Sequence, residues 1–313
     1  MTSPLPGDAV ELLRQEHEVD LYEGPEPLPR EEMRRRIAGA SALLCLLSEK
    51  IDAEIMGAAP NLKVIANYAV GTDNVDLAHA RRRGIRVCNT PGVLTESTAE
   101  LAFALLLAVS RRIVEGDKFV REGKFTGWAP SLFLGRDLYG STVGVIGMGR
   151  IGQAFARRAK ACGAKIIYFN RHKLPADIEK ALEAKLVTVD ELLRESDFVS
   201  LHCPLTPETR GLLSREKLLT MKPTAYLINT ARGPVVDEKA LVELLRQGKL
   251  AGAGFDVYEN EPKLAPGLTE LPNVVLAPHV GSATIGTRSE MARMCARAII
   301  DVLAGREPKN AVA

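Results

Sequence analysis

The stretch TVGVIGMGRIG, residues 142–152, decides the fold of this chain. Its first five residues are mostly β-branched and apolar, which predicts a strand, and residues 153–159 continue in a helical pattern. Between them stand Gly147, Gly149 and Gly152 in the spacing G-x-G-x-x-G. A strand, a glycine turn and the start of a helix in this order are typical of a dinucleotide site.

Each glycine has a predicted task. Gly147 permits the tight turn, Gly149 leaves space for a pyrophosphate beside the backbone, and Gly152 lets the helix pack closely on the strand. The N–H groups of the first helical turn then point at the anion. The alternative is a glycine turn that binds nothing, but the flanking strand and helix favour the dinucleotide.

The next predicted strand, residues 165–169, indicates which dinucleotide is preferred. An NAD site places Asp or Glu after this strand, to hold the ribose 2′-OH, whereas this chain has Asn170 and Arg171, followed by His172 and Lys173. A guanidinium pairs well with a 2′-phosphate through two hydrogen bonds. We therefore predict NADP as the preferred cofactor and NAD as the lesser one; the alternative is a solvated basic loop with relaxed cofactor choice.

Length and composition indicate a globular protein of two domains. The 313 residues can form two cores, and 46% hydrophobic with 26% charged residues excludes a disordered or fibrous chain. The net charge of +2 says little about partners. The basic runs at residues 33–36 and 81–83 lie in helical patterns with acidic neighbours, so they indicate solvated faces and no nucleic-acid partner.

The cysteines and the apolar runs indicate the cellular compartment of the protein and whether it associates with a membrane. No CxxC pair or metal-ligand spacing occurs, so we predict no metal site and buried thiols in a reducing, cytoplasmic compartment. The longest apolar run, residues 101–109, is too short to cross a bilayer, and there is no signal peptide, so no membrane association is expected. The five cysteines are Cys45, Cys88, Cys162, Cys203 and Cys295.

The first 94 residues alternate between strand and helix patterns, which predicts a parallel sheet covered by helices. The expected strands are residues 18–22, 42–47, 62–66 and 85–88. The expected helices are residues 8–16, 30–37, 52–58 and 76–83. Residues 4–7 resemble the loop after a first strand, yet no strand pattern precedes them. Either a strand precedes Met1, or the sheet has one strand fewer.

A second α/β unit begins after a linking helix. Ser97 and Glu100 stand in the S-x-x-E spacing of a capping box, predicting a helix that runs to about Arg112. Its apolar residues lie on several faces, which favours a homodimer interface over burial within one monomer. Residues 123–137 are a predicted loop whose bulky apolar side chains, including Trp128, are expected to be pinned, with the other subunit as one candidate.

The predicted architecture is α/β, with two Rossmann-like, doubly wound parallel-sheet domains and a cleft between them. The dinucleotide-binding domain is predicted at residues 95–283. The substrate-binding domain is predicted at residues 1–94 together with residues 284–313, because the final helix, residues 287–303, is expected to return to the first unit. Further strands are expected at residues 143–146, 165–169, 198–201, 225–229, 252–257 and 274–277.

Three chemically active side chains follow strands of the second unit. Arg232 follows residues 225–229, Glu261 follows the strand ending at Val257, and His279 follows residues 274–277. Ligands of open α/β sheets bind at such strand ends. The guanidinium suits the carboxylate and carbonyl oxygens of a 2-oxo acid, the imidazole suits proton transfer, and the carboxylate can orient the ring and favour imidazolium. We predict a catalytic set for hydride transfer between a nicotinamide and a 2-oxo acid, rather than a structural histidine.

Nearly the whole chain resembles the D-isomer-specific 2-hydroxyacid dehydrogenase family, and its glyoxylate/hydroxypyruvate reductase branch most closely. The motifs that carry this resemblance are NYAVGTDNVD at residues 67–76, NTPG at 89–92, the glycine loop, HCPLTPET at 202–209, NTARG at 229–233 and PHVGS at 278–282.

The resemblance implies the same catalytic set, Arg232, Glu261 and His279. It implies that the backbone of Val70 and Gly71 helps to hold the substrate carboxylate, and that Trp128 reaches into the partner's active site. It also implies cofactor contacts from Arg150, Ile151, Pro204, Thr209, Thr230 and Asp256, the last toward the nicotinamide carboxamide.

The predicted activity is NAD(P)H-dependent reduction of glyoxylate or hydroxypyruvate to glycolate or D-glycerate by a homodimer. The alternatives are a family member of the D-lactate or 3-phosphoglycerate type, and a dinucleotide-sensing protein like the corepressors built on this fold. Formate-oxidising relatives carry Gln where this chain has Glu261, which argues against formate. The lack of a long C-terminal regulatory extension argues against the larger phosphoglycerate enzymes.

Overall fold

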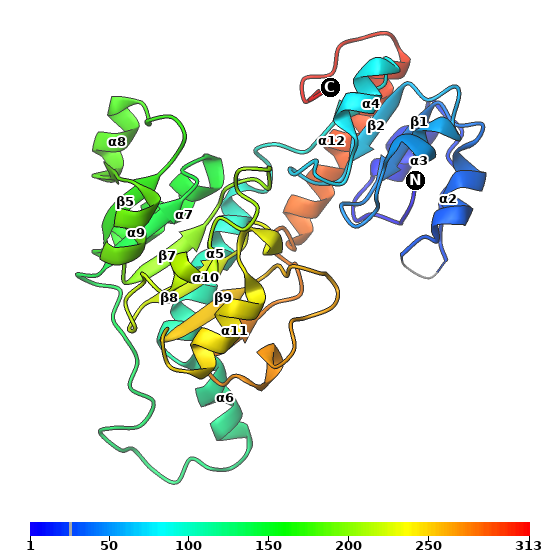
Figure 1. Ribbon diagram of the computed structural model, residues 1–313. Helices are drawn as coiled ribbons and strands as arrows, with labels where there is room; N and C mark the ends of the chain where they lie inside the picture. Colours follow the sequence, from blue (N-terminus) through cyan, green and yellow to red (C-terminus); the bar gives the residue numbers. More distant parts are fainter. Residues whose placement is uncertain (25–26) are drawn as a thin grey trace. The chain divides into compact units, whose positions relative to one another are not determined.

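The computed structural model describes residues 1–24 and 27–313, and the chain divides into two compact units (Figure 1). Unit 1 is Met1–Leu94 with Ser282–Ala313, and unit 2 is Thr95–Gly281. The second crossing between the units, expected after residue 283, follows residue 281. Both units are α/β with parallel sheets, as the sequence predicts.

Unit 1 contains a three-stranded parallel sheet in the order β1-β2-β3. Its strands are β1 (Ala42–Cys45), β2 (Val64–Asn67) and β3 (Arg86–Cys88). Its helices are α1 (Ala9–Arg14), α2 (Arg30–Ile37), α3 (Ala53–Gly57), α4 (Leu77–Arg82) and α12 (Ile285–Leu303). Alternate strand residues point to opposite faces, so α2, α3 and α4 share a core with one face while α12 packs on the other. The last helix of the chain thus returns to the first unit.

The start of the chain lies beside β1. The backbone N–H of Thr2 donates to Leu44 O at 3.1 Å, and the N–H of Tyr22 donates to Met1 O at 3.0 Å. The prediction of a strand at residues 18–22 is wrong, because that segment is not a strand in the structure. It hydrogen-bonds to the short N-terminal segment, which offers too few backbone partners for a ladder.

Unit 2 contains a seven-stranded parallel sheet in the order β10-β9-β8-β7-β4-β5-β6. The strands are β4 (Thr142–Ile146), β5 (Lys165–Phe169), β6 (Lys185–Leu186), β7 (Phe198–Leu201), β8 (Tyr226–Asn229), β9 (Gly252–Phe255) and β10 (Val274–Leu276). The chain reverses its direction of travel across the sheet after β6, when it returns to β7 on the other side of β4. Ligands of such sheets bind at this reversal, outside the carboxyl ends of the strands.

Helices cover both faces of this sheet, which makes it doubly wound. One core joins the sheet to α5 (Thr95–Ser110), α7 (Arg150–Ala161) and α8 (Ala176–Leu182). The other joins it to α9 (Val189–Glu195), α10 (Arg215–Leu218) and α11 (Glu238–Arg246). The short 3₁₀ helices η1 (Gly233–Val235) and η2 (Leu268–Glu270) lie in the connections. In the described ranges no helix is both long and apolar enough to span a membrane.

The linking helix differs from its prediction at both ends. Helix α5 starts at Thr95, so Ser97 lies inside the helix and the predicted capping box is wrong. Glu100 pairs instead with Arg158 of α7, with 3.0 Å between oxygen and nitrogen. The helix ends at Ser110, and the following helix, α6 (Ile113–Arg121), which has no buried residue, was not predicted from the sequence.

Candidate functional site

The glycine loop joins β4 to α7 and has room for an anion. Gly147 has a φ of +95°, and a Cβ there would lie 2.5 Å from the backbone nitrogen of Cys203. A Cβ on Gly152 would overlap the carbonyl oxygen of Gly147, whereas one on Gly149 would meet nothing within 4 Å. Two glycines are therefore required by the fold, and Gly149 leaves open space at the N-terminus of a 12-residue helix. This geometry fits a pyrophosphate that accepts hydrogen bonds from the first turn, at Arg150 and Ile151.

The loop after β5 presents cations and no carboxylate. Asn170 Nδ2 donates to the carbonyl of His172 at 3.0 Å, and Arg171 and His172 are exposed. Lys173 is engaged elsewhere, because its Nζ lies 3.1 Å from Glu179 Oε2. The pKa of Glu208 lies below its ordinary value, chiefly through a hydrogen bond with Thr206 and in smaller part through the charge of Arg171. Arg171 is therefore the cationic side chain of this loop that is most available to pair with a bound phosphate.

The loop of residues 204–209 is closed by a threonine. Thr209 Oγ1 donates to Pro204 O at 2.6 Å and accepts the backbone N–H of Thr206 at 2.8 Å.

Thr230, directly after β8, has a buried hydroxyl oxygen with no hydrogen-bond partner in the part of the chain described. An unsatisfied buried hydroxyl is costly, and a bound cofactor group at this strand end would satisfy it.

Arg232 is held by the asparagine that ends β8. Asn229 is 1% exposed, its Nδ2 donates to Arg232 O at 3.0 Å, and its Oδ1 accepts the N–H of Ala231 at 3.0 Å. The guanidinium Nη1 donates to Ala231 O at 2.8 Å. The buried amide therefore fixes the backbone on which the guanidinium stands.

Glu261 and His279 form a hydrogen-bonded pair. His279 Nδ1 lies 2.8 Å from Glu261 Oε2, while Glu261 Oε1 accepts the N–H of Tyr258 at 2.9 Å. Burial acts to raise the pKa of Glu261, but the hydrogen bond and charge of His279, with the N–H of Tyr258 and the charge of Arg232, together outweigh it, so that the pKa lies below its ordinary value. The carboxylate thus stays ionised and holds one ring nitrogen, which leaves Nε2 for proton exchange with a substrate.

Asp256 holds the backbone that follows His279. Its two carboxylate oxygens accept the N–H groups of Val280 at 2.7 Å and Gly281 at 2.8 Å, and burial raises its pKa. His279 itself has a φ of +55°, a left-handed conformation that is uncommon outside glycine. Sequence reasoning missed this anchoring role. The signal available was an acidic residue directly after a buried strand.

His202 shows what a structural histidine looks like in this unit. Its Nε2 lies 2.9 Å from Ser200 Oγ, its ring lies 5.0 Å from that of Phe155, and burial lowers its pKa to about 3. It is therefore neutral and part of the packing. Among the histidines of unit 2, His279 by contrast has a carboxylate partner at a strand end.

In unit 1, two asparagines hold the segment of Val70 and Gly71. Asn89 Nδ2 donates to Val70 O at 2.7 Å, and the fully buried Asn67 donates from Nδ2 to Gly71 O at 2.8 Å. Fixing both carbonyls also fixes the peptide planes that carry the neighbouring N–H groups. This segment can therefore present ordered backbone donors.

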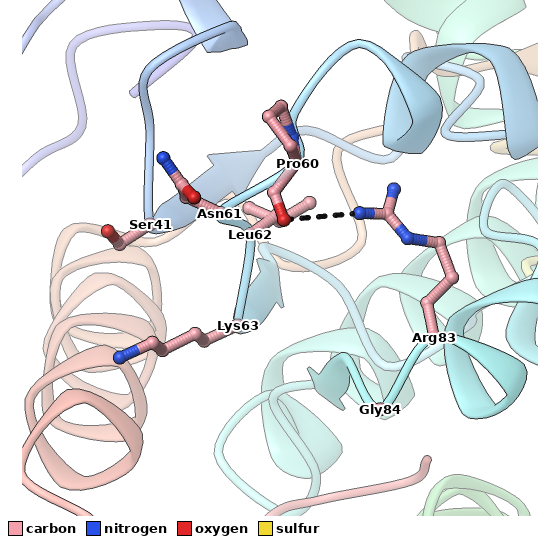
Figure 2. A pocket seen from close by; sticks show the side chains of 7 residues that line it. All are labelled: Ser41, Pro60, Asn61, Leu62, Lys63, Arg83 and Gly84. Carbon is pink, nitrogen blue, oxygen red and sulfur yellow. Dashed lines mark hydrogen bonds between the residues drawn. The ribbon is translucent and has the colours of Figure 1, made fainter.

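A separate surface hollow of about 460 Å³ lies at the amino ends of the unit 1 strands (Figure 2). Ser41, Lys63 and Gly84 line it, and each precedes a strand. The Arg83 guanidinium that points into it already donates to the carbonyls of Ala59 and Pro60. None of the predicted site residues lies in this hollow.

Trp128 is 83% exposed in the long loop before β4. The loop is anchored to its own chain by Phe133, whose ring centroid lies 5.2 Å from that of Phe119 and beneath the Arg112 guanidinium. The rest of the loop is largely exposed. Within one chain, the Trp128 side chain is therefore largely uncovered.

The doubly wound sheet, the glycine loop and the arginine, glutamate and histidine of neighbouring strand ends define a class, the nicotinamide-dependent oxidoreductases. Residues 103–281 match the NAD binding domain of the D-isomer specific 2-hydroxyacid dehydrogenases. The chain belongs to this family and is an NAD(P)-dependent 2-hydroxyacid dehydrogenase.

Relatives agree over the full length. The glyoxylate reductase of Thermococcus onnurineus is 49% identical over 316 residues, covering 100% of this chain and 94% of the relative. The crystal structure of the TT0316 protein from Thermus thermophilus superposes with a TM-score of 0.94 at 51% identity, covering 100% and 98%. The NADPH-dependent glyoxylate/hydroxypyruvate reductase of Sinorhizobium meliloti, solved with NADP and malonate, has a TM-score of 0.85 at 33% identity, covering 98% and 95%.

Proposed function

We propose that this protein reduces glyoxylate and hydroxypyruvate to glycolate and D-glycerate, with NADPH preferred over NADH. The observation that carries the proposal is the 2.8 Å hydrogen bond between His279 Nδ1 and Glu261 Oε2. His279 follows β10, and Arg232 follows β8, which lies two strands away in the same sheet. Relatives named for this activity, of nearly the same length, support the choice of substrate.

His279 donates the proton that the reduction requires. When bound, the reduced nicotinamide supplies a hydride to the carbonyl carbon of the 2-oxo acid. The carbonyl oxygen then takes the proton from His279 Nε2, which makes the hydroxyl group and leaves the ring neutral. Glu261 stabilises the protonated ring and holds its orientation, so that the proton is available in the direction of reduction.

Arg232 binds the substrate. Its planar guanidinium can donate two hydrogen bonds to the carboxylate and carbonyl oxygens, which orients the carbonyl and withdraws electron density from its carbon. We assign the backbone N–H groups of Val70 and Gly71 to the substrate carboxylate as well. The asparagine hydrogen bonds to their carbonyls support this assignment.

The cofactor is assigned to the glycine loop and the loops beside it. Gly147, Gly149, Gly152 and the first turn of α7 would hold the pyrophosphate, and Asn170 and Arg171 the ribose with its 2′-phosphate. The unsatisfied hydroxyl of Thr230 supports a contact at the nicotinamide end. Further contacts are assigned to Pro204, Thr209 and Asp256.

We assign a homodimer in which Trp128 of one subunit reaches the substrate of the other. The support is that one chain leaves large apolar side chains uncovered: Ile113 and Val120 of α6 are 55% and 57% exposed, and Trp128 is 83% exposed. Exposed patches of this kind mark association sites. Five free cysteines, four of them buried, support a cytoplasmic location, where thiols stay reduced.

The first test is NADPH oxidation with glyoxylate, hydroxypyruvate, pyruvate and phosphohydroxypyruvate, with NADH in parallel. We expect the first two to give the highest kcat/KM. Arg232→Ala should lower kcat/KM for the 2-oxo acid by about 10²-fold, through loss of charge-assisted hydrogen bonds. The control is Arg246→Ala, which removes an exposed arginine paired with Glu270. Preference for pyruvate or phosphohydroxypyruvate would reject the proposed substrate.

The subunit assignment has its own test. Trp128→Ala and His279→Ala subunits, each weakly active, are mixed and allowed to exchange. If Trp128 serves the partner's site, a mixed dimer contains one site with both residues, and activity returns. If mixing restores nothing, or if the purified protein is monomeric by light scattering, the assignment is rejected.

A further inference from the structure

Glu238 is a buried carboxylate that the proposed mechanism does not use. It is the first residue of α11 and is 4% exposed. The helix start is already capped by Asp237, whose Oδ1 accepts the N–H of Ala240 at 2.9 Å. Glu238 Oε2 instead accepts the backbone N–H of Glu259 at 2.8 Å, in the loop that follows β9.

That loop joins the three strand ends of the proposed site. Tyr258 donates its N–H to Glu261 Oε1 and its hydroxyl to the carbonyl of Ala277, 2.9 Å away and two residues before His279. On its other side, a Cβ added to Gly233, the residue after Arg232, would overlap the backbone of Tyr258. Tyr258 is therefore the residue at which the segments bearing Arg232, Glu261 and His279 meet, through its backbone and its hydroxyl.

Glu238 lowers the stability of the fold at its buried position. Burial raises its pKa, and the charges of Glu259 and Glu261 raise it further, although the backbone amides of Glu259 and Ala265 act in the opposite direction. Its second oxygen, Oε1, is buried without a hydrogen-bond partner in the described ranges. A buried carboxylate without a cation destabilises a fold, and such departures from good packing are expected at functional positions.

We propose that Glu238 is a positioning residue for proton transfer, which holds the backbone of Glu259 and through it the orientation of Glu261 toward His279. This inference rests on the catalytic roles proposed above for Glu261 and His279. Glu238 touches neither substrate nor cofactor in this scheme, so it acts on turnover through the geometry of the pair. Misplacement of a catalytic group by about 1 Å can lower a rate by about 10²-fold.

The test compares Glu238→Ala with Glu238→Gln, and Lys239→Ala is the control because Lys239 is its exposed neighbour on α11. Glu238→Ala removes the acceptor of the Glu259 N–H, and we expect kcat to fall by about tenfold or more while the Kd for NADPH changes by less than about twofold. Glu238→Gln keeps a carbonyl oxygen as acceptor, and we expect its kcat to lie within about threefold of the parent value.

A spectroscopic readout separates this inference from the proposed substrate. With ¹⁵N-labelled histidine, the hydrogen-bonded proton at His279 Nδ1 gives a downfield signal, assigned by its loss in His279→Ala. We expect this signal to shift or disappear in Glu238→Ala and to persist in Glu238→Gln, whichever 2-oxo acid is turned over. If Glu238→Ala does not fold, Glu238→Asp, which shortens the side chain and keeps the charge, replaces it in both measurements.

Two outcomes overturn the inference. One is a Glu238→Ala protein with the parent kcat and an unchanged His279 signal. The other is an equal loss of kcat and NADPH affinity in the Ala and Gln variants, which would indicate a general structural role. Failure of the parent enzyme to reduce any 2-oxo acid would reject the proposed function, while the His279 signal would still decide the role of Glu238.

Discussion

The carboxyl edge of the seven-stranded sheet carries two regions that work by different means. After β4 the chain presents glycines, open space at Gly149 and the N-terminus of α7. After β8, β9 and β10 it presents Arg232, Glu261 and His279. The first region can bind an anion through its backbone N–H groups, whereas any chemistry in the second region depends on charged side chains.

The two regions are also supported differently. Gly147 and Gly152 allow the glycine loop to touch backbone directly, since a Cβ would collide with Cys203 or with Gly147 itself. The side-chain region is held by buried polar groups, namely Asn229 under Arg232 and Asp256 behind His279. Changes in the first region should therefore alter the fold or cofactor affinity, and changes in the second should alter turnover.

The largest effect is expected for His279→Ala. Loss of the proposed proton donor should lower kcat by about 10²- to 10⁴-fold, the usual contribution of general acid catalysis. The Kd for NADPH, measured by fluorescence quenching, should stay near the parent value because the glycine loop is untouched. A variant with parent kcat, or one that loses NADPH affinity in proportion, would contradict the separation of the two regions.

The variants Gly147→Ala and Gly149→Ala separate two roles of the glycine loop, namely its contribution to stability and its contribution to NADPH binding. At Gly147 a methyl group meets backbone in a left-handed conformation, so we expect about 3 kcal/mol of lost unfolding free energy. At Gly149 the methyl group meets open space, so stability should be retained while NADPH binding weakens. Urea unfolding and NADPH titration measure the two effects. Equal stability losses would show that Gly149 is also required by the fold.

Asn229→Ala tests the support of the side-chain region. It leaves the Ala231 N–H and the Arg232 carbonyl without their partner, and we expect a loss of about 2 kcal/mol in unfolding free energy. The KM for the 2-oxo acid should rise as Arg232 loses its fixed backbone. The matched control is Asn61→Ala, at an exposed asparagine of unit 1, which should leave both quantities unchanged.

Arg171→Ala tests the cofactor preference. We expect the ratio of kcat/KM with NADPH to that with NADH to fall by about tenfold, the value of one lost charge-assisted contact. Lys173→Ala should have a smaller effect, because Lys173 is already paired with Glu179. A parent enzyme that uses NADH as well as or better than NADPH would show the preference to be wrong before any variant is made.

The smallest effect concerns pH and Glu261. The pKa of Glu261 in the folded protein lies below its ordinary value, so its ionised form stabilises the fold above that ordinary value. This contribution is lost as the pH falls through the lower, folded-state value. Glu261→Gln should therefore lose less stability on acidification than the parent, as urea unfolding at neutral and acidic pH would measure. An unchanged pH dependence would mean that the pair is not formed in solution.

The sequence predicted most of unit 2 because local patterns there agree with the tertiary structure. The strands at residues 165–169 and 198–201 appear at their predicted bounds. The glycine spacing predicted the strand, turn and helix that the structure shows around Gly147. Residues at the ends of parallel strands were expected at one edge, which follows from topology alone.

The predictions that failed depended on contacts distant in sequence. Residues 18–22 have a strand pattern, but the backbone hydrogen bonds of Asp20 and Tyr22 are made with Met1 and not with a strand. Glu100 has the spacing of a capping box, but it forms an ion pair with Arg158, which lies 58 residues away in sequence. In both cases the local preference contributes less free energy than the tertiary contacts that replace it.

The sequence by itself determined the family, the glycine loop and the residue types at the strand ends, because these depend on short spacings and on chain topology. Only the tertiary structure decided which backbone groups Asn229, Asp256 and Glu238 bind, and that Glu261 faces His279 at hydrogen-bonding distance. A hydrogen bond of this kind needs two distant segments to be placed within a few tenths of an ångström. No periodicity or motif encodes that placement, which comes from the packing of the whole unit.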